Sequence, residues 1–90
     1  MKSFVCSLCH HGILGGALYL DNQSLTYMTN KLTVDPKYRK LVLPMQDIKG
    51  IAWKRIIFPI ATVNMRDGKQ YKFIIFNQPR FEKWFHEYSR

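Results

Sequence analysis

Hydrophobic and polar residues alternate along most of this chain with a period of two, which is typical of half-buried β-strands. In the first such run Phe4, Cys6 and Leu8 share one face. Six further runs follow, separated by residues that favour turns. The expected strands are residues 3–10, 17–21, 24–29, 41–45, 48–55, 60–66 and 70–76. The pattern therefore predicts a mainly β domain.

Turn signals lie between several of these runs. Residues 12–16 contain three glycines and predict a flexible corner, because glycine adopts backbone angles that other residues resist. Residues 21–23 predict a turn, and Asp67-Gly68 is the strongest hairpin signal in the chain. Pro44 indicates an edge strand or a bend, since proline cannot donate to a ladder. Residues 30–39 fit no strand and are expected to form an excursion.

The last part of the chain changes period. Its aromatic residues recur at i, i+3, i+4 and i+7, which places them on one stripe of a helix. They are Phe81, Trp84, Phe85 and Tyr88. Pro79 suits a first helical turn, and Asn77 or Gln78 precedes it as a cap. We expect a helix over about residues 79–90 that buries this stripe in the open end of a curled sheet.

Composition agrees with one compact core. A chain of 90 residues forms a single domain, residues 1–90, and 47% of its residues are hydrophobic. The chain contains fourteen Lys and Arg and six Asp and Glu, which gives a formal charge of +8. This charge favours anionic partners. No run approaches the roughly 20 apolar residues of a membrane span. With only two cysteines, the expected location is cytoplasmic, peripheral to the membrane if the domain binds lipid.

Four segments carry a further pattern, in order along the chain. Residues 15–25 read G-G-A-L-Y-L-D-N-Q-S-L, and residues 30–32 read N-K-L. Residues 43–48 read L-P-M-Q-D-I, and residues 67–73 read D-G-K-Q-Y-K-F. Together they resemble the motifs of bacterial GRAM domains, namely G-x-L-Y-L-T-N-x-R-L, H-K-L/F-N, I-P-L-x-D-I and D-G-K-x-Y-x-F.

This resemblance implies a pleckstrin-homology-like fold, a partly open antiparallel barrel of about seven strands capped by a C-terminal α-helix. Domains of this fold bind phosphoinositides, peptides or protein partners. Phosphoinositide-binding relatives place basic residues in the corner between the first two strands. Residues 11–15 contain no Lys or Arg, so we do not expect binding at that corner. The resemblance implies a non-catalytic binding module.

Residues 6–10 satisfy the haem-attachment pattern C-x-x-C-H. The pattern is short, lies in an expected strand and has no export signal, so no haem is expected. A zinc site from Cys6, Cys9, His10 and His11 has suitable ligands. However, Cys6 and Cys9 point to opposite faces of a strand, and adjacent histidines rarely reach one metal. We therefore expect no metal, and no cofactor.

Catalytic signatures are also missing from the sequence. It contains no Ser-His-Asp or Cys-His arrangement accompanied by an oxyanion-hole motif. It also contains no phosphate-binding loop of the G-x-x-x-x-G-K type. With six carboxylates in all, it has few acids or bases. We expect that the protein is not an enzyme and has no small-molecule substrate.

Two basic clusters are the candidate ligand or membrane surface. The first is Lys37, Arg39 and Lys40, and the second is Lys54 and Arg55, directly before the apolar residues 56–58. A basic loop with an apolar tip that includes Phe58 is suited to an anionic membrane. Isolated apolar residues usually pack, however, so burial of this tip is the favoured interpretation. The clusters contribute together only if they share a face.

The leading hypothesis is a module that binds anionic lipid headgroups or a membrane surface. The alternative is a protein-interaction or homodimerisation module without a lipid ligand, since an open barrel leaves edge strands for pairing. Nucleic acid ranks below lipid. Aromatic and basic residues alternate, as at Tyr71-Lys72-Phe73, which is typical of nucleic-acid binding. Any half-buried strand with lysine on its solvent-exposed face shows the same alternation.

Overall fold

The computed structural model describes residues 1–9, 12–30, 36–55 and 57–89. Within these residues, seven strands precede one α-helix. The strands are β1 (Lys2–Cys9), β2 (Ile13–Leu20), β3 (Ser24–Met28), β4 (Lys40–Pro44), β5 (Ile48–Arg55), β6 (Pro59–Met65) and β7 (Gln70–Ile75). Short 3₁₀ helices η1 (Pro36–Tyr38) and η2 (Met45–Asp47) flank β4, and the helix α1 (Gln78–Tyr88) follows β7.

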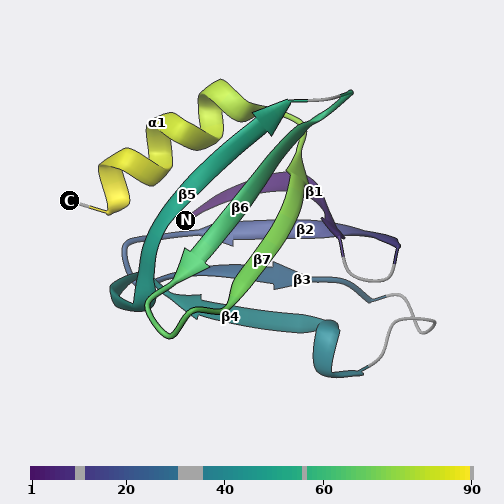
Figure 1. The fold of residues 1–90 in the computed structure, drawn as a ribbon, viewed down its shortest axis with the longest axis horizontal. Coiled ribbons are helices and arrows are strands. Elements are labelled where there is room, and N and C mark those ends of the chain that lie inside the picture. Colours follow the sequence, from purple (N-terminus) through teal and green to yellow (C-terminus); the bar gives the residue numbers. More distant parts are fainter. Residues whose placement is uncertain (10–11, 31–35, 56, 90) are drawn as a thin grey trace.

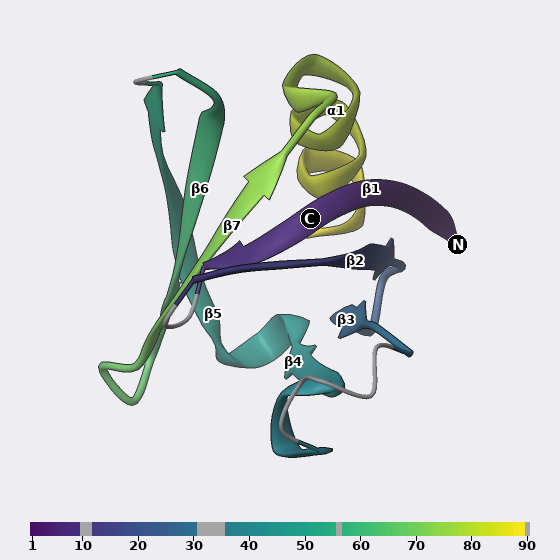
Figure 2. The ribbon, with the colours of Figure 1, turned by 90° about the vertical axis from the view of Figure 1, so that its right-hand side faces the viewer.

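The strands form one antiparallel sheet in the order β4-β3-β2-β1-β7-β6-β5. The sheet folds over at the β1–β7 pair, which extends over only three residue pairs. As a result β5–β7 cross β1–β4 steeply (Figures 1 and 2). This mainly β architecture, partly open and followed by a C-terminal helix, confirms the predicted fold class. Pro44 ends β4, an edge strand, as its sequence position indicated.

Helix α1 lies over the opening between the two halves of the sheet (Figure 2). Its Phe81 is fully buried and contacts rings from both halves, Phe4 of β1 at 5.1 Å and Trp53 of β5 at 5.9 Å between centroids. The remaining aromatic residues of the stripe are half-buried against the same core. The Asn77 side chain accepts the backbone N–H of Arg80 and caps the helix, as expected. The stripe therefore joins the two halves.

At the other end of the sheet, hydrogen bonds tie the β6–β7 hairpin to η2. The backbone N–H of Arg66 donates to the Asp47 carbonyl, and its Nε donates to the Gln46 carbonyl, both at 2.9 Å. The predicted Asp67-Gly68 hairpin is confirmed, with Gly68 at φ +92°, a conformation that favours glycine.

The turn after β2 is also confirmed. The Asp21 carboxylate accepts the backbone N–H groups of Gln23 and Ser24 at 2.8 and 2.9 Å. These hydrogen bonds stabilise the charged form and lower the pKa of Asp21 below its usual value. An aspartate at this position therefore closes the β2–β3 hairpin by bonding the local backbone.

The predicted glycine corner at residues 12–16 is wrong in extent. β2 begins at Ile13, four residues earlier than expected, because all eight residues of β1 find partners in it. Gly16 lies inside this strand for a steric reason. A Cβ atom there would lie 2.5 Å from the carbonyl oxygen of Met28 and 2.8 Å from the ring of Tyr27. Glycine at this position thus serves close packing rather than a turn.

No helix among the described residues is long and apolar enough to cross a membrane.

Candidate functional site

A cleft of about 580 Å³ opens between the start of β7, the end of β1, η1 and the start of β4. Its walls come from parts of the chain that are distant in sequence. The lining residues are Leu8, Cys9, Lys37, Tyr38, Leu41, Lys69, Gln70, Tyr71 and Lys72. We call this the basic cleft, because three lysines and no carboxylate occur among these residues.

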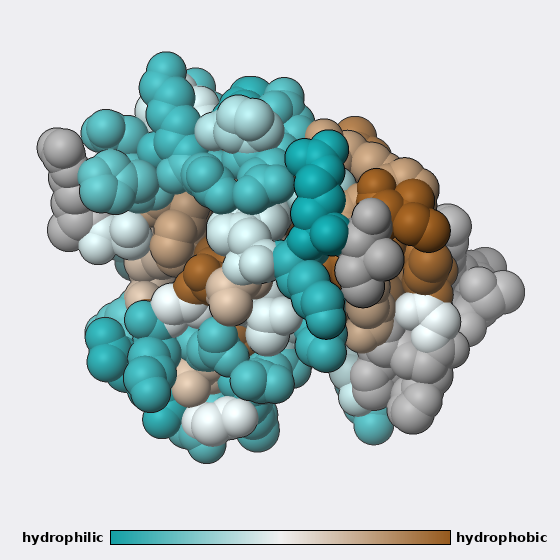
Figure 3. Space-filling model, turned by 45° about the horizontal axis from the view of Figure 1, so that its top comes forward, coloured by the Kyte–Doolittle hydropathy of each residue, from teal (hydrophilic) through white to brown (hydrophobic). Residues whose placement is uncertain are grey.

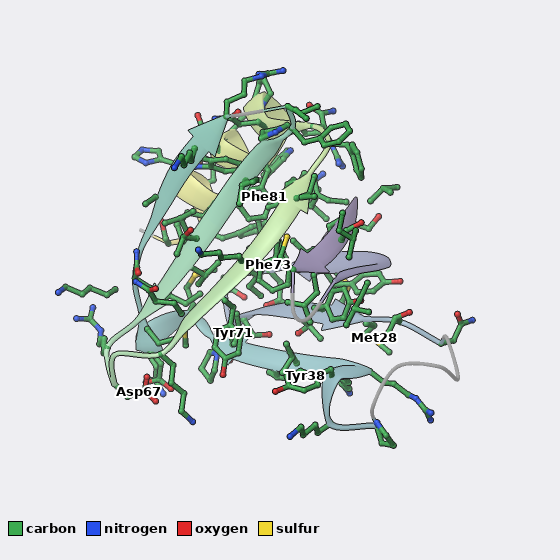
Figure 4. The ribbon with its side chains drawn as sticks, turned by 45° about the vertical axis from the view of Figure 1, so that its right-hand side comes forward. Met28, Tyr38, Asp67, Tyr71, Phe73 and Phe81 are labelled. Carbon is green, nitrogen blue, oxygen red and sulfur yellow. The ribbon has the colours of Figure 1, made fainter. Side chains whose placement is uncertain are left out.

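Two half-buried tyrosines stand on opposite walls of the basic cleft. Tyr71 lies on β7 and Tyr38 ends η1, and both pack against the hydrophobic core (Figure 4). The ammonium group of Lys37 lies 5.2 Å from the centre of the Tyr38 ring. Lys69 and Lys72 are exposed on the opposite wall. Packed tyrosines therefore fix the shape of the cleft, while its positive charge is carried by solvated lysines.

Cys9 also lines the basic cleft, and its thiol is a nucleophilic group. Burial raises its pKa, and the positive charge of Lys72 acts in the opposite direction. Cys6 points into the core instead, where burial, and to a lesser degree Cys9, raise its pKa to about 12. Both thiols are free.

This difference predicts selective labelling. With a thiol reagent at pH 8, Cys9 should react in the folded protein, whereas Cys6 should react only on unfolding, because only about 1 in 10⁴ Cys6 groups is a thiolate at that pH. Cys9→Ser should abolish the fast reaction, and Cys6→Ser should retain it. Fast labelling of both thiols in native buffer would contradict this assignment.

The first predicted basic cluster is divided by the structure. Lys37 lines the basic cleft, whereas Lys40 is exposed on β4. Arg39 lies between them, half-buried, with its carbonyl accepting the N–H of Thr29 at 2.9 Å. Of these three residues, only Lys37 lines the basic cleft.

The second cluster lies at the β5–β6 turn, on the opposite side of the molecule from η1 (Figure 1). Lys54 and Arg55 are exposed there. The favoured prediction for the tip is wrong, because Ile57 and Phe58 are 79% and 47% exposed. Strand alternation is the reason: Pro59 turns inward at the start of β6, so its neighbour Phe58 faces outward. Ile56 lies outside the described residues.

Lys69 and Lys72 were missing from the predicted site. They belong to the turn and strand that follow Asp67-Gly68, some thirty residues after Lys37 in the sequence. Only the curling of the sheet brings β7 opposite η1, and no local pattern carries that information. The sequence signal for these lysines is the alternation in Tyr71-Lys72-Phe73, which also fits any strand with one solvent-exposed face.

The proposed metal ligands do not gather in the described part of the chain. There, no three His, Cys, Asp or Glu side chains come together. Cys6 is buried on the inner face of β1, and Cys9 follows three residues later on the outer face, as strand alternation predicts. His10 and His11 lie outside the described residues.

Comparisons with known proteins show the fold alone. No family model matches this sequence, and no curated protein matches it. Among solved structures, it is similar to the crystal structure of the C-terminal domain of an unknown protein from Leishmania infantum. The TM-score is 0.77 at 14% identity, over all of this chain and 84% of that one.

Proposed function

We propose that this chain is a non-catalytic binding module of the GRAM-like, pleckstrin-homology-like kind, and that its basic cleft takes the phosphate-bearing headgroup of an anionic lipid at a membrane surface. The observation that supports this is the convergence of Lys69 and Lys72 with Lys37 around a cleft whose described lining contains no carboxylate.

The dimensions and chemistry of the basic cleft suit such a ligand. Small-molecule sites commonly enclose about 300–1,000 Å³, and this cleft has about 580 Å³. Lysine provides a compact ammonium that meets phosphate oxygens, and the Tyr38 and Tyr71 hydroxyls can donate further hydrogen bonds.

Charge reversal in the cleft tests the proposal. Lys72→Glu should weaken binding to vesicles rich in phosphatidylserine about tenfold at low salt, because each cation near such a surface contributes about 1 kcal/mol and reversal removes one and adds a repulsion. The loss should shrink at high salt, where exposed charges are screened. Co-sedimentation measures the effect.

The matched control is Lys83→Glu on α1, which changes the net charge equally at an exposed site outside the cleft. It should alter vesicle binding less than about twofold. Equal losses for both variants would mean that only net charge matters and that the basic cleft is not the site.

The alternative is a protein partner, and one observation favours it. β5 has eight residues and pairs only with β6 in the described part of the chain, which leaves its second edge open. Backbone groups on such an edge can pair with a peptide or with a second copy. Vesicle binding that is absent in the wild type, together with a dimeric mass by light scattering, would favour this function.

A further inference from the structure

The outer face of the sheet carries apolar residues where a solvated sheet face would be polar. Phe4 and Cys6 of β1 and Phe73 and Ile75 of β7 point into the core. The residues between them in the sequence therefore point to the outer face. Ile74 nevertheless has only 6% of its surface exposed. Apolar side chains are therefore gathered on this face as well as inside.

Strand register places five of them in one row. Phe58 and Phe76 are in contact, with their ring centroids 5.9 Å apart. The β1–β7 pairing ends at Cys6 and Ile75, and Val5 and Phe76 are the next residues along the chain beyond that pair. Ala17 is the partner of Val5 on β2, and Met28 is the partner of Ala17 on β3. We call Phe58, Phe76, Val5, Ala17 and Met28 the apolar strip.

Four of the five residues of the apolar strip are exposed, and Ala17 is half-buried. Val5 is 71% exposed, Phe76 54% and Met28 43%. Ile57 extends the strip at the β5–β6 turn, and brown side chains gather at this end of the molecule (Figure 3). A soluble monomer rarely leaves a contiguous apolar surface uncovered without a partner for it.

Cations lie at both ends of the apolar strip. On β4 the partner of Met28 is Lys40, and next to the β5–β6 turn lie Lys54 and Arg55. The described carboxylates lie elsewhere, in the β2–β3 turn, η2, the β6–β7 turn and α1. They are Asp21, Asp47, Asp67, Glu82 and Glu87. Figure 4 shows Asp67 and Met28 on opposite sides of the molecule.

We propose that the apolar strip rests in the interfacial layer of an anionic membrane, with Lys40, Lys54 and Arg55 meeting the headgroups on either side. The inference rests on the proposed function and adds a second contact surface to it. Strand alternation places Cys9 and Lys72, which border the basic cleft, on the same outer face four residues from Val5 and Phe76. The basic cleft and the apolar strip are therefore neighbours along β1 and β7.

Charge decides between a membrane and a second copy of this chain. A two-fold contact through the apolar strip would set the same surface against itself, so that each cationic end would meet another cationic end or an uncharged surface. An anionic lipid layer offers an apolar region bordered by negative charge, which complements the strip and its ends.

The test compares serine substitutions in binding to phosphatidylserine-rich vesicles. Val5→Ser and Phe58→Ser should each weaken binding about five- to tenfold, at low and at high salt alike, because the loss comes from apolar area rather than charge. Val42→Ser is the matched control, since Val42 is an exposed strand valine on β4 outside the strip. It should change binding less than about twofold.

Melting curves for each variant show whether the fold is retained, and Ile57→Ser, at the most exposed of these positions, provides a variant with the least effect on packing. If Lys72→Glu weakens binding while Val5→Ser and Phe58→Ser match Val42→Ser, the strip inference is overturned and the proposed function stands. If Val5→Ser and Phe58→Ser weaken binding while Lys72→Glu does not, the basic cleft is not the headgroup site and the strip inference stands. A dimer that Val5→Ser dissociates would assign the strip to a second copy and overturn the inference.

Discussion

Replacing Phe81 with alanine should lower the free energy of unfolding by about 3–5 kcal/mol, the usual range for truncation of a buried large aromatic side chain. Phe81 is fully buried, and its ring contacts Phe4 from one half of the sheet and Trp53 from the other. Its removal would leave a cavity where α1 joins both halves. A domain of this size has about 5–15 kcal/mol of stability in total, so the loss would be a large fraction of it.

Urea unfolding followed by tryptophan fluorescence measures the effect, with Phe76→Ala as the control. Phe76 is also a phenylalanine, but about half of its surface is exposed, and it should contribute less than about 1 kcal/mol. Similar losses for the two variants would mean that α1 does not close the core through Phe81.

The strands and the helix could be predicted because their signals are local. Alternation with a period of two identifies strands from a few consecutive residues, and the aromatic stripe identifies α1 from one segment. The same periodicity does not tell which residue of the stripe is buried most deeply. That Phe81 lies deepest, with Trp84 half-buried, depends on which strands the helix crosses, and this follows from the bend of the sheet at β1 and β7.

The candidate surfaces could not be predicted in the same way, because both depend on strand order. The basic cleft unites Lys37 with Lys72 only because the sheet curls. The apolar strip combines the β1–β2 and β2–β3 registers with the ring contact of Phe58 and Phe76. The sequence did point to Lys54, Arg55 and Phe58 as a candidate membrane surface, but with burial of the apolar tip as the favoured interpretation. The structure shows instead that Phe58 is about half exposed and that its ring contacts Phe76.

Gly16 shows how a residue that suggests a turn can be required by packing, and Gly16→Ala should destabilise the domain by about 1–3 kcal/mol. The added methyl would meet the Met28 carbonyl oxygen, which belongs to the backbone of β3 and cannot move without disturbing the β2–β3 ladder. It would also press on the ring of Tyr27, whose hydroxyl donates a 2.7 Å hydrogen bond to the Leu14 carbonyl.

The control for this prediction is Gly50→Ala in β5, where an added Cβ would meet nothing within 4 Å. That change should stay within about 0.5 kcal/mol of the wild type, or stabilise slightly by restricting the unfolded chain. Thermal or urea unfolding of the pair separates steric crowding from the general effect of replacing glycine. If the two variants were equally stable, β3 would be free to move away from β2. The close packing of Tyr27 over Gly16 would then not hold this half of the sheet together.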